Sequence, residues 1–219
     1  TPGCASRGIS HREIISRVRI LMVASEVHPF AKTGGLADVL GALPRALAKL
    51  GYDVDVVMPR YRGIEAGSPI GQISVSLGGQ VDVTDVSAVI DHGVRIVFIA
   101  HAGYYERDHL YGASSRDFPD NPERFAFLSQ AALSWAASTG HKYDIVHAHD
   151  WQTGLVPLML QRTVPAWRGP ARPATVFTIH NLAYQGIFDA SWLPRLGLGY
   201  DLMRMDALEY WNRISFLKS

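Results

Sequence analysis

The stretch that decides the fold begins with Val18-Arg19-Ile20-Leu21-Met22-Val23-Ala24. A short run of this kind, rich in branched apolar residues, is typical of a strand buried on both faces of a sheet. Apolar residues then recur at helical spacing and stop before Gly51, where a carboxyl-terminal cap belongs. The members of this stripe are Leu36, Val39, Leu40, Leu43, Leu47 and Leu50. Residues 54–58 form a second apolar run, which Pro59 stops. Strand, helix and strand in this order predict a βαβ unit with parallel strands and a right-handed crossover.

Two further patterns follow this unit along the chain. Residues 81–90 and 94–99 are rich in valine and isoleucine and flank Asp91-His92-Gly93. They predict a β-hairpin inserted after the βαβ unit. Asn121-Pro122-Glu123 predicts a helix start, with a cap residue, an early proline and a negative charge, and Gly140 predicts its end. The buried stripe of this helix is predicted to be Phe125, Leu128, Ala132 and Trp135.

The remaining chain continues the alternation of strands and helices. Residues 143–148 and 175–179 predict two buried strands, and residues 154–162 predict the helix between them. Residues 207–217 predict one more helix. We therefore expect residues 17–219 to form a single α/β domain, Rossmann-like and doubly wound, with a mostly parallel sheet and an inserted β-hairpin.

The composition narrows the class of partner. The 219 residues carry 21 basic and 20 acidic side chains, so no global field attracts nucleic acid or an anionic membrane. Cys4 is the only cysteine, which excludes an internal disulfide and favours a reducing, cytosol-like compartment. No apolar run approaches the roughly 18 residues needed to span a bilayer. Residues 1–16 lack a signal-peptide core and are expected to be a leader, an expression remnant, the end of an upstream segment or part of a transit peptide.

In a doubly wound sheet, ligands bind outside the carboxyl ends of the strands, which selects three loops. The first is EVHPFAKTGGLAD, residues 26–38. Gly34-Gly35 at the helix entrance lets a ligand approach the backbone, the free amides of the first turn favour an anion, and Lys32 adds a positive charge. A diphosphate or a crowded sugar oxygen would suit this loop; the alternative is a plain turn with a solvated lysine. The loop matches neither the P-loop nor the dinucleotide-binding glycine pattern. Asp53 or Asp55 has the position of a ribose-binding acid, but the alternative is a solvated strand end.

The second loop is HAHDWQTG, residues 147–154. Its two histidines and one aspartate could ligate a metal ion. However, no third carboxylate or histidine is nearby, so we predict no metal site. Asp150 either caps the following helix or accepts a hydrogen bond from a sugar hydroxyl, with Trp151 as apolar support.

The third loop is TIHNLAYQG, residues 178–186. His180 and Asn181 end a strand, and a phenol and an amide follow, which is the density of hydrogen-bonding groups that a carbohydrate needs. The alternative is that His180 is satisfied by a carbonyl group within the protein.

These loops carry a resemblance to a known family. Residues 32–39 (KTGGLADV), 41–44 (GALP), 147–151 (HAHDW), 178–186 and 215–218 (SFLK) resemble segments of bacterial glycogen synthases and plant starch synthases, the ADP-glucose-dependent glycosyltransferase family 5. The resemblance runs from Arg17 to Lys218. It implies the amino-terminal half of a GT-B fold and transfer of glucose from ADP-glucose to the non-reducing end of an α-1,4-glucan. It further implies that the reaction retains configuration and requires no metal and no other cofactor.

The resemblance also implies roles for single residues. Asp150 and His180 are implied to be catalytic. The substrate-binding residues are implied to be Lys32, Gly34, Gly35, Asp38 and Asn181. One departure concerns Phe118, which stands where many members have a tyrosine; Tyr104, Tyr105 or Tyr111 could substitute for it.

The family's diphosphate-gripping arginine, lysine and glutamate lie in a second domain that this sequence does not contain. We therefore expect that carboxyl-terminal domain to be a partner and the chain alone to be inactive. The protein is expected in the cytoplasm, or in a plastid if it comes from a plant or alga. Uncovered apolar surface around Trp211, Phe216 and Leu217 is expected to promote self-association. Three alternatives stay open: a non-catalytic module that binds glucan or nucleotide, a GT-B enzyme with UDP-glucose or sucrose chemistry, and a dehydrogenase, which lacks its glycine fingerprint here.

Overall fold

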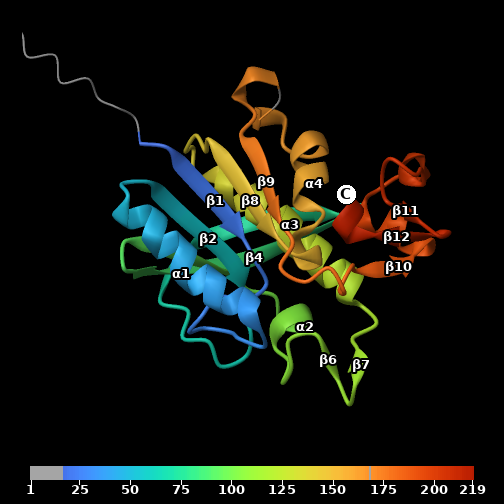
Figure 1. The fold of residues 1–219 in the computed structure, drawn as a ribbon, viewed down its shortest axis with the longest axis horizontal. Helices are drawn as coiled ribbons and strands as arrows, with labels where there is room; N and C mark the ends of the chain where they lie inside the picture. Colours follow the sequence, from blue (N-terminus) through green and yellow to red (C-terminus); the bar gives the residue numbers. More distant parts are fainter. Residues whose placement is uncertain (1–16, 168) are drawn as a thin grey trace, which may run out of the picture.

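A seven-stranded sheet forms the centre of the protein in a computed structural model that describes residues 17–167 and 169–219. The strand order is β3-β4-β5-β2-β1-β8-β9 (Figure 1). The strands that run parallel are β1 (Arg19–Val23), β2 (Asp53–Pro59), β5 (Val94–Ile99), β8 (Ile145–His149) and β9 (Ala174–Thr178). The antiparallel strands are β3 (Ser68–Leu77) and β4 (Gln80–Asp91). The predicted class, a mostly parallel α/β sheet, is confirmed.

The βαβ unit lies at the middle of this sheet. Strand β1 pairs in parallel with β2, Ile20 opposite Val54, and helix α1 (Gly35–Lys49) connects them. Connections leave β1 in one direction toward β2 and β5 and in the other toward β8 and β9. Right-handed crossovers in opposite directions place helices on opposite faces, so α1 covers one face and α3 (Asn121–Ser138) the other (Figure 1).

Helix α3 lies deeper than an amphipathic surface helix. Its predicted stripe, from Phe125 to Trp135, is buried, but so are most residues on its other sides. The helix packs against the sheet, against α4 (Val156–Arg162) and against the 3₁₀ segment η1 (Trp151–Thr153). It therefore links the sheet to the carboxyl-terminal part of the domain.

The predicted hairpin exists, but its place in the sheet differs. Strand β4 pairs with β5 through the turn after Asp91, as predicted. However, β5 also runs parallel to β2, so it belongs to the parallel sheet, and the antiparallel insertion is β3 with β4. The sequence interpretation missed β3 because serine and glycine interrupt its apolar residues, and only alternate side chains near its end are buried.

Strand β9 is not buried as predicted. It is the last strand in the order of the sheet, and Val176 is 41% exposed. A fully apolar run does not by itself tell a central strand from an edge strand.

The predicted helix over residues 207–217 is wrong. The segment forms β11 (Glu209–Tyr210) and β12 (Arg213–Ser215), which join β10 (Ile187–Asp189) in an antiparallel sheet of order β10-β12-β11. The reversal uses Trp211 and Asn212, both with positive φ, as a two-residue turn. The pairing of β12 with residues 26 positions earlier is a long-range contact that helical periodicity cannot report.

The same segment corrects the expected apolar surface. Phe216 is fully buried, and Leu217 is partly buried, so neither offers an open patch. Trp211 is 81% exposed, as expected.

The other elements are short. They are α2 (Ala102–Tyr105), β6 (Gly112–Ala113), β7 (Arg116–Asp117) and the 3₁₀ helices η2 (Pro165–Trp167), η3 (Gly169–Ala171), η4 (Ala190–Leu196), η5 (Tyr200–Leu202) and η6 (Phe216–Lys218). None of the helices in residues 17–167 and 169–219 has the length and apolar character to cross a membrane. The expectations for residues 1–16 and Cys4 lie outside the described residues.

Candidate functional site

A cavity of about 890 Å³ opens at the carboxyl ends of β1, β8 and β9. The three loops selected from the sequence converge on it, because β1 and β8 are the neighbours at which the winding of the sheet reverses direction. The lining includes Glu26, Thr33, Gly34, Gly35, Tyr111, Asp117, Asp150, Trp151, His180, Asn181, Tyr184 and Gln185. The location of the site was thus predictable from the order of the secondary-structure elements.

The cavity brings most of the predicted site residues together, but not Lys32 and Asp38. The Nζ atom of Lys32 lies 2.6 Å from Oδ1 of Asp38, and both side chains are exposed beside the entrance of α1 rather than in the cavity wall. Exposed pairs of this kind add little stability. The ion pair holds the ammonium group of Lys32 beside the entrance of α1, where the sequence pattern had indicated a mobile lysine.

The amino terminus of α1 supplies backbone donors to the cavity. Gly34 is the extended cap residue, and Gly35 begins the helix, with no side-chain cap on its first amides. A Cβ atom added to either glycine would meet no heavy atom within 4 Å. Unsatisfied first-turn amides together with the helix dipole favour an anion. This geometry favours the ligand interpretation of the glycine pair over the plain turn.

Glu26 braces the loop that carries the glycine pair. It is 3% exposed. One of its carboxylate oxygens accepts from the backbone N–H of Thr33 at 2.5 Å, and the other accepts from the Thr33 hydroxyl at 2.7 Å and the Tyr111 hydroxyl at 2.5 Å. The sequence interpretation assigned no role to Glu26. The available signal was a carboxylate directly after the carboxyl end of a buried strand at the ligand edge of the sheet.

Asp150 connects the second loop to the third. Its Oδ1 accepts from the backbone N–H of His180 at 2.6 Å and of Asn181 at 3.4 Å. It makes no capping hydrogen bond to η1, so the capping interpretation is wrong. The backbone of Asp150 has φ 58° and ψ 177°, a conformation that side-chain-bearing residues rarely adopt. Its side-chain bonds to the third loop and its own N–H bond to the Thr178 carbonyl, at 3.0 Å, hold it there.

His180 contacts another imidazole rather than a carbonyl. Its Nε2 lies 3.0 Å from Nδ1 of His149, and the ring of His147 packs 4.0 Å from that of His149. Burial, with smaller effects of the two neighbouring histidines, lowers the pKa of His149 to about 2. Burial also lowers the pKa of His147, whose Nε2 lies 2.7 Å from the Thr178 hydroxyl. Within the described residues, no group of three or more ligating side chains is arranged to hold a metal ion.

Trp151 supports the floor of the cavity, as its position in the motif indicated. Its ring lies 5.1 Å from Phe125 and 5.6 Å from Phe188. Gly186, at φ 59°, packs against it, since a Cβ there would approach the Trp151 ring to 2.6 Å. The last residue of the third loop must therefore be glycine for the loop to lie over the indole.

Phe118 does not reach the cavity, whereas Tyr111 does. The centre of the Phe118 ring lies 4.7 Å from the guanidinium carbon of Arg107 and 5.1 Å from that of Arg124. Tyr111 lines the cavity, and its hydroxyl lies 2.8 Å from that of Ser25. Of the three tyrosines considered as substitutes, Tyr111 is the one that the structure places in the site.

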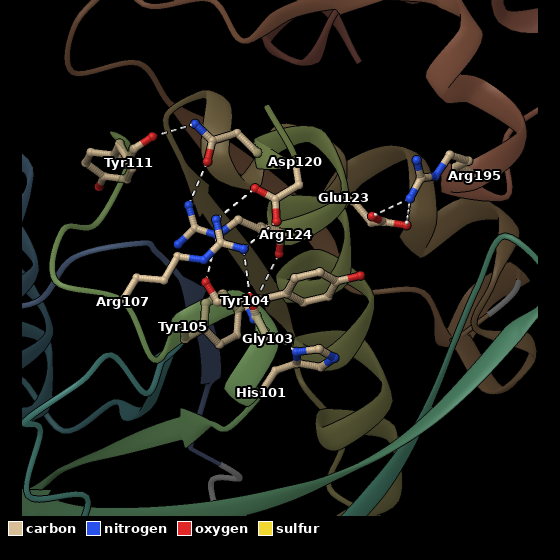
Figure 2. Close-up of polar contacts among 11 residues, drawn as sticks. His101, Gly103, Tyr104, Tyr105, Arg107, Tyr111, Asp120, Glu123, Arg124 and Arg195 are labelled. Carbon is tan, nitrogen blue, oxygen red and sulfur yellow. Dashed lines mark hydrogen bonds and ion pairs between the residues drawn. The ribbon is translucent and has the colours of Figure 1, made fainter. Parts of the chain in front are cut away.

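Buried Arg124 fixes the loop that carries Tyr111 (Figure 2). Arg124 donates to the carbonyl of Tyr104 at 2.8 Å and to the side chain of Asn121 at 2.6 Å. Asn121 in turn donates to the carbonyl of Tyr111 at 2.8 Å. Tyr111 is therefore held from α3 at its backbone and from Glu26 at its hydroxyl.

Neither Asp53 nor Asp55 belongs to the site. Asp55 is buried and accepts from Arg95 at 2.8 and 2.9 Å and from the Tyr143 hydroxyl at 2.6 Å. Asp53 pairs with Arg19 at 3.2 Å. Both lie in the first half of β2, away from the carboxyl end. The structure rules out a ribose-binding role for them and shows that Asp55 is not a solvated strand end.

The fold and the cavity define the class: a doubly wound α/β domain with a cavity at the reversal point of its sheet. A family model described as the starch synthase catalytic domain matches residues 19–219. The chain therefore belongs to the starch synthase catalytic domain family.

Individual relatives agree with this assignment. The chain is 44% identical to a glycogen synthase of Syntrophotalea carbinolica, over 92% of this chain and 43% of the relative. It is 41% identical to glycogen synthase 2 of Geobacter sulfurreducens over the same shares. The catalytic domain of starch synthase IV from Arabidopsis thaliana, bound to ADP and acarbose, superposes with a TM-score of 0.80 at 30% identity, over 92% of this chain and 42% of that one. The chain thus has the fold of a GT-B glycosyltransferase domain and spans less than half the length of these relatives.

Proposed function

We propose that this chain forms one wall of the active site of a retaining glucosyltransferase, which moves glucose from ADP-glucose to the non-reducing end of an α-1,4-glucan. One observation supports the proposal: the amino terminus of α1, Asp150 and His180 line one cavity in a chain of the starch synthase family. The relative solved with ADP and acarbose supports a nucleoside diphosphate and a glucan as ligand classes.

The leaving diphosphate requires positive potential where its charge develops. The first-turn amides at Gly34 and Gly35 provide it without reorganisation, because the helix and the Glu26 brace hold them in place. Lys32 lies at the edge of the same region, and its ammonium group would contact the diphosphate in exchange for Asp38. These groups act more strongly on the transition state, in which the diphosphate becomes more negative, than on the bound donor.

The glucosyl group requires hydroxyl partners and a negative charge near the ring. Asp150 uses Oδ1 for the third loop, while Oδ2 makes no hydrogen bond to any described residue. That oxygen is available to a sugar hydroxyl and stabilises positive charge that grows on the ring as the glycosidic bond breaks. His180 and Asn181 supply further polar contacts from a loop that Asp150 holds in position.

The proposed mechanism needs a partner surface across the cavity. We assign that part to a carboxyl-terminal domain of the kind that makes up the rest of the relatives' length. Lacking those groups, residues 1–219 alone would show no glucosyl transfer, although hydroxyl contacts would still bind glucan weakly. We assign no cofactor, and the cytoplasm as the compartment, in keeping with a single cysteine.

The test grafts residues 17–219 in place of the matching segment of the Syntrophotalea carbinolica relative. The expected result is transfer of glucose from ADP-glucose to a maltooligosaccharide, with UDP-glucose used far less well, and no transfer by residues 1–219 alone. In the graft, His180→Ala should lower turnover on the order of a hundredfold or more with little change in melting temperature.

Three outcomes contradict the proposal in different ways. Preference for UDP-glucose would assign the site to another GT-B reaction. A folded graft without transfer, together with ADP or glucan binding by the chain, would indicate a non-catalytic module. Steady turnover by residues 1–219 alone would mean that the catalytic groups are misplaced.

A further inference from the structure

The ring of His149 is enclosed beside the candidate catalytic histidine. His149 is the last residue of β8 and has no exposed surface. Its Nδ1 lies 3.0 Å from Nε2 of His180, and the two rings are nearly parallel, with centroids 5.3 Å apart. The other nitrogen of His149, Nε2, is buried and has no hydrogen-bond partner among the described residues.

A buried imidazole of this kind is neutral. Desolvation, with the nearby His147 and His180 rings, keeps the pKa of His149 at about 2, far below its ordinary value. A neutral imidazole carries one N–H, which leaves two arrangements for the bond between the rings. Either His149 donates from Nδ1 to Nε2 of His180, or His180 donates from Nε2 to Nδ1 of His149.

The unpartnered Nε2 of His149 decides between the two arrangements. If His180 were the donor, the proton of His149 would sit on Nε2 as a buried N–H without an acceptor. If His149 is the donor, its Nε2 is only an unused lone pair. Buried N–H groups without an acceptor are rarer than buried acceptors with an unused lone pair. A buried donor without a hydrogen bond costs its full desolvation free energy. His149 is therefore the donor, and Nε2 of His180 is the acceptor.

We propose that His149 is a positioning residue that holds His180 in the tautomer protonated on Nδ1, so that the ring offers an N–H to a hydroxyl-rich ligand in the cavity. The tautomer follows from the bond between the two rings, whereas the identity of the ligand rests on the proposed function. Nδ1 of His180 makes no hydrogen bond to a described residue and is not enclosed, so it is free to meet a ligand.

Two neighbours divide the positioning of His180 between them. Asp150 holds its backbone through the 2.6 Å bond to the N–H, and His149 holds its ring. The ring of His147 lies 4.0 Å from that of His149, but its Nε2 bonds to Thr178, so it supports His149 without touching the proton between His149 and His180. His149 thus has a proposed role that neither the metal-binding hypothesis nor the family motif assigned to it.

The experiment records long-range ¹H–¹⁵N spectra of the chain with ¹⁵N-labelled histidine, which show which ring nitrogens carry protons. His180→Gln assigns the signals. In the unmodified chain, His180 is expected to be protonated on Nδ1 and unprotonated on Nε2. His149→Phe keeps a planar ring but removes the donor, so Nε2 of His180 should lose its hydrogen bond and its ¹⁵N signal should move to that of a free acceptor nitrogen. His149→Asn places an amide donor where Nδ1 was and should restore the original signature.

The matched control is His147→Phe, which alters the stack without removing the donor and should leave the His180 tautomer unchanged. A His180 ring protonated on Nε2 in the unmodified chain overturns the proposal, even if His149→Phe fails to fold. An unchanged Nε2 signal of His180 in folded His149→Phe overturns it as well. Because no turnover is measured, failure of the glucosyltransferase proposal leaves this result intact. If the tautomer is as expected but His149→Phe transfers glucose normally in the graft, the proposed role of His180 is the part that fails.

Discussion

Adding one methyl group at Gly35 separates a ligand-binding role of the glycine pair from a structural one. Gly35 is the first residue of α1, and a Cβ there would meet no heavy atom within 4 Å. It does not occupy the left-handed region, so alanine is not strained at this position. Alanine is favoured over glycine in a helix by about 0.5–1 kcal/mol, partly because the unfolded chain loses less freedom. Gly35→Ala should therefore leave the free energy of unfolding unchanged or raise it by up to about 1 kcal/mol.

The effect on binding should have the opposite sign. The added methyl group projects into the space from which a ligand would contact the first-turn amides. Loss of one hydrogen bond to a charged group corresponds to about 1.5–3 kcal/mol, or roughly a ten- to hundredfold weaker affinity. Urea unfolding of the chain measures the first effect, and ADP titration of the grafted enzyme measures the second.

Gly154→Ala is the matched control for this substitution. A Cβ at Gly154 would overlap the backbone carbonyl of Phe216, so this variant should lose about 1–3 kcal/mol of stability. Two results would refute the reasoning for Gly35. Destabilisation of Gly35→Ala by more than 1 kcal/mol would show that the turn itself needs glycine. Unchanged ADP affinity would show that the ligand does not approach these amides.

Two further predictions concern stability. Between the ordinary histidine pKa of 6.5 and about 2, the unfolded chain binds a proton at His149 that the folded chain does not. The contribution of neutral His149 to the free energy of unfolding is thus fully present above pH 6.5 and falls by about 1.4 kcal/mol per pH unit as the pH decreases. Urea unfolding at several pH values should show a smaller slope for His149→Asn than for the unmodified chain. Asp55→Ala leaves the Arg95 guanidinium and the Tyr143 hydroxyl without their acceptor, so it should cost about 3 kcal/mol or more. Asp53→Ala, whose pair is more exposed, should cost at most about 1 kcal/mol, and equal losses for the two would contradict this account.

Local sequence patterns predicted those parts of the fold that local backbone preferences determine. Apolar periodicity and turn residues act within a few positions, so they predicted the run before Ala24, the stripe of α1, the turn after Asp91 and the start of α3 at Asn121. The patterns failed where burial depends on a distant neighbour. Residues 207–217 have an apolar spacing compatible with a helix, yet they form strands because β10 lies beside them.

The candidate site divides in the same way. Its location at the carboxyl ends of β1, β8 and β9, and the residues Asp150, His180 and Asn181, followed from the order of elements and from the loops themselves. The connections among these residues did not follow. Glu26 and Tyr111 meet across 85 positions of sequence, which no local pattern reports.

The amino-acid sequence by itself therefore determined the class of fold, the edge of the sheet at which the cavity opens and most of the residues that line the cavity. The tertiary structure alone decided which groups are paired and which remain free for a ligand. His149 and His180 are 31 positions apart, and they meet because β8 and β9 run in parallel register, with His149 beside Thr178. That register places the end of one loop against the start of another and buries the imidazole between them. Burial then removes its charge and leaves it a single proton to donate, a property that exists only after the strands have paired.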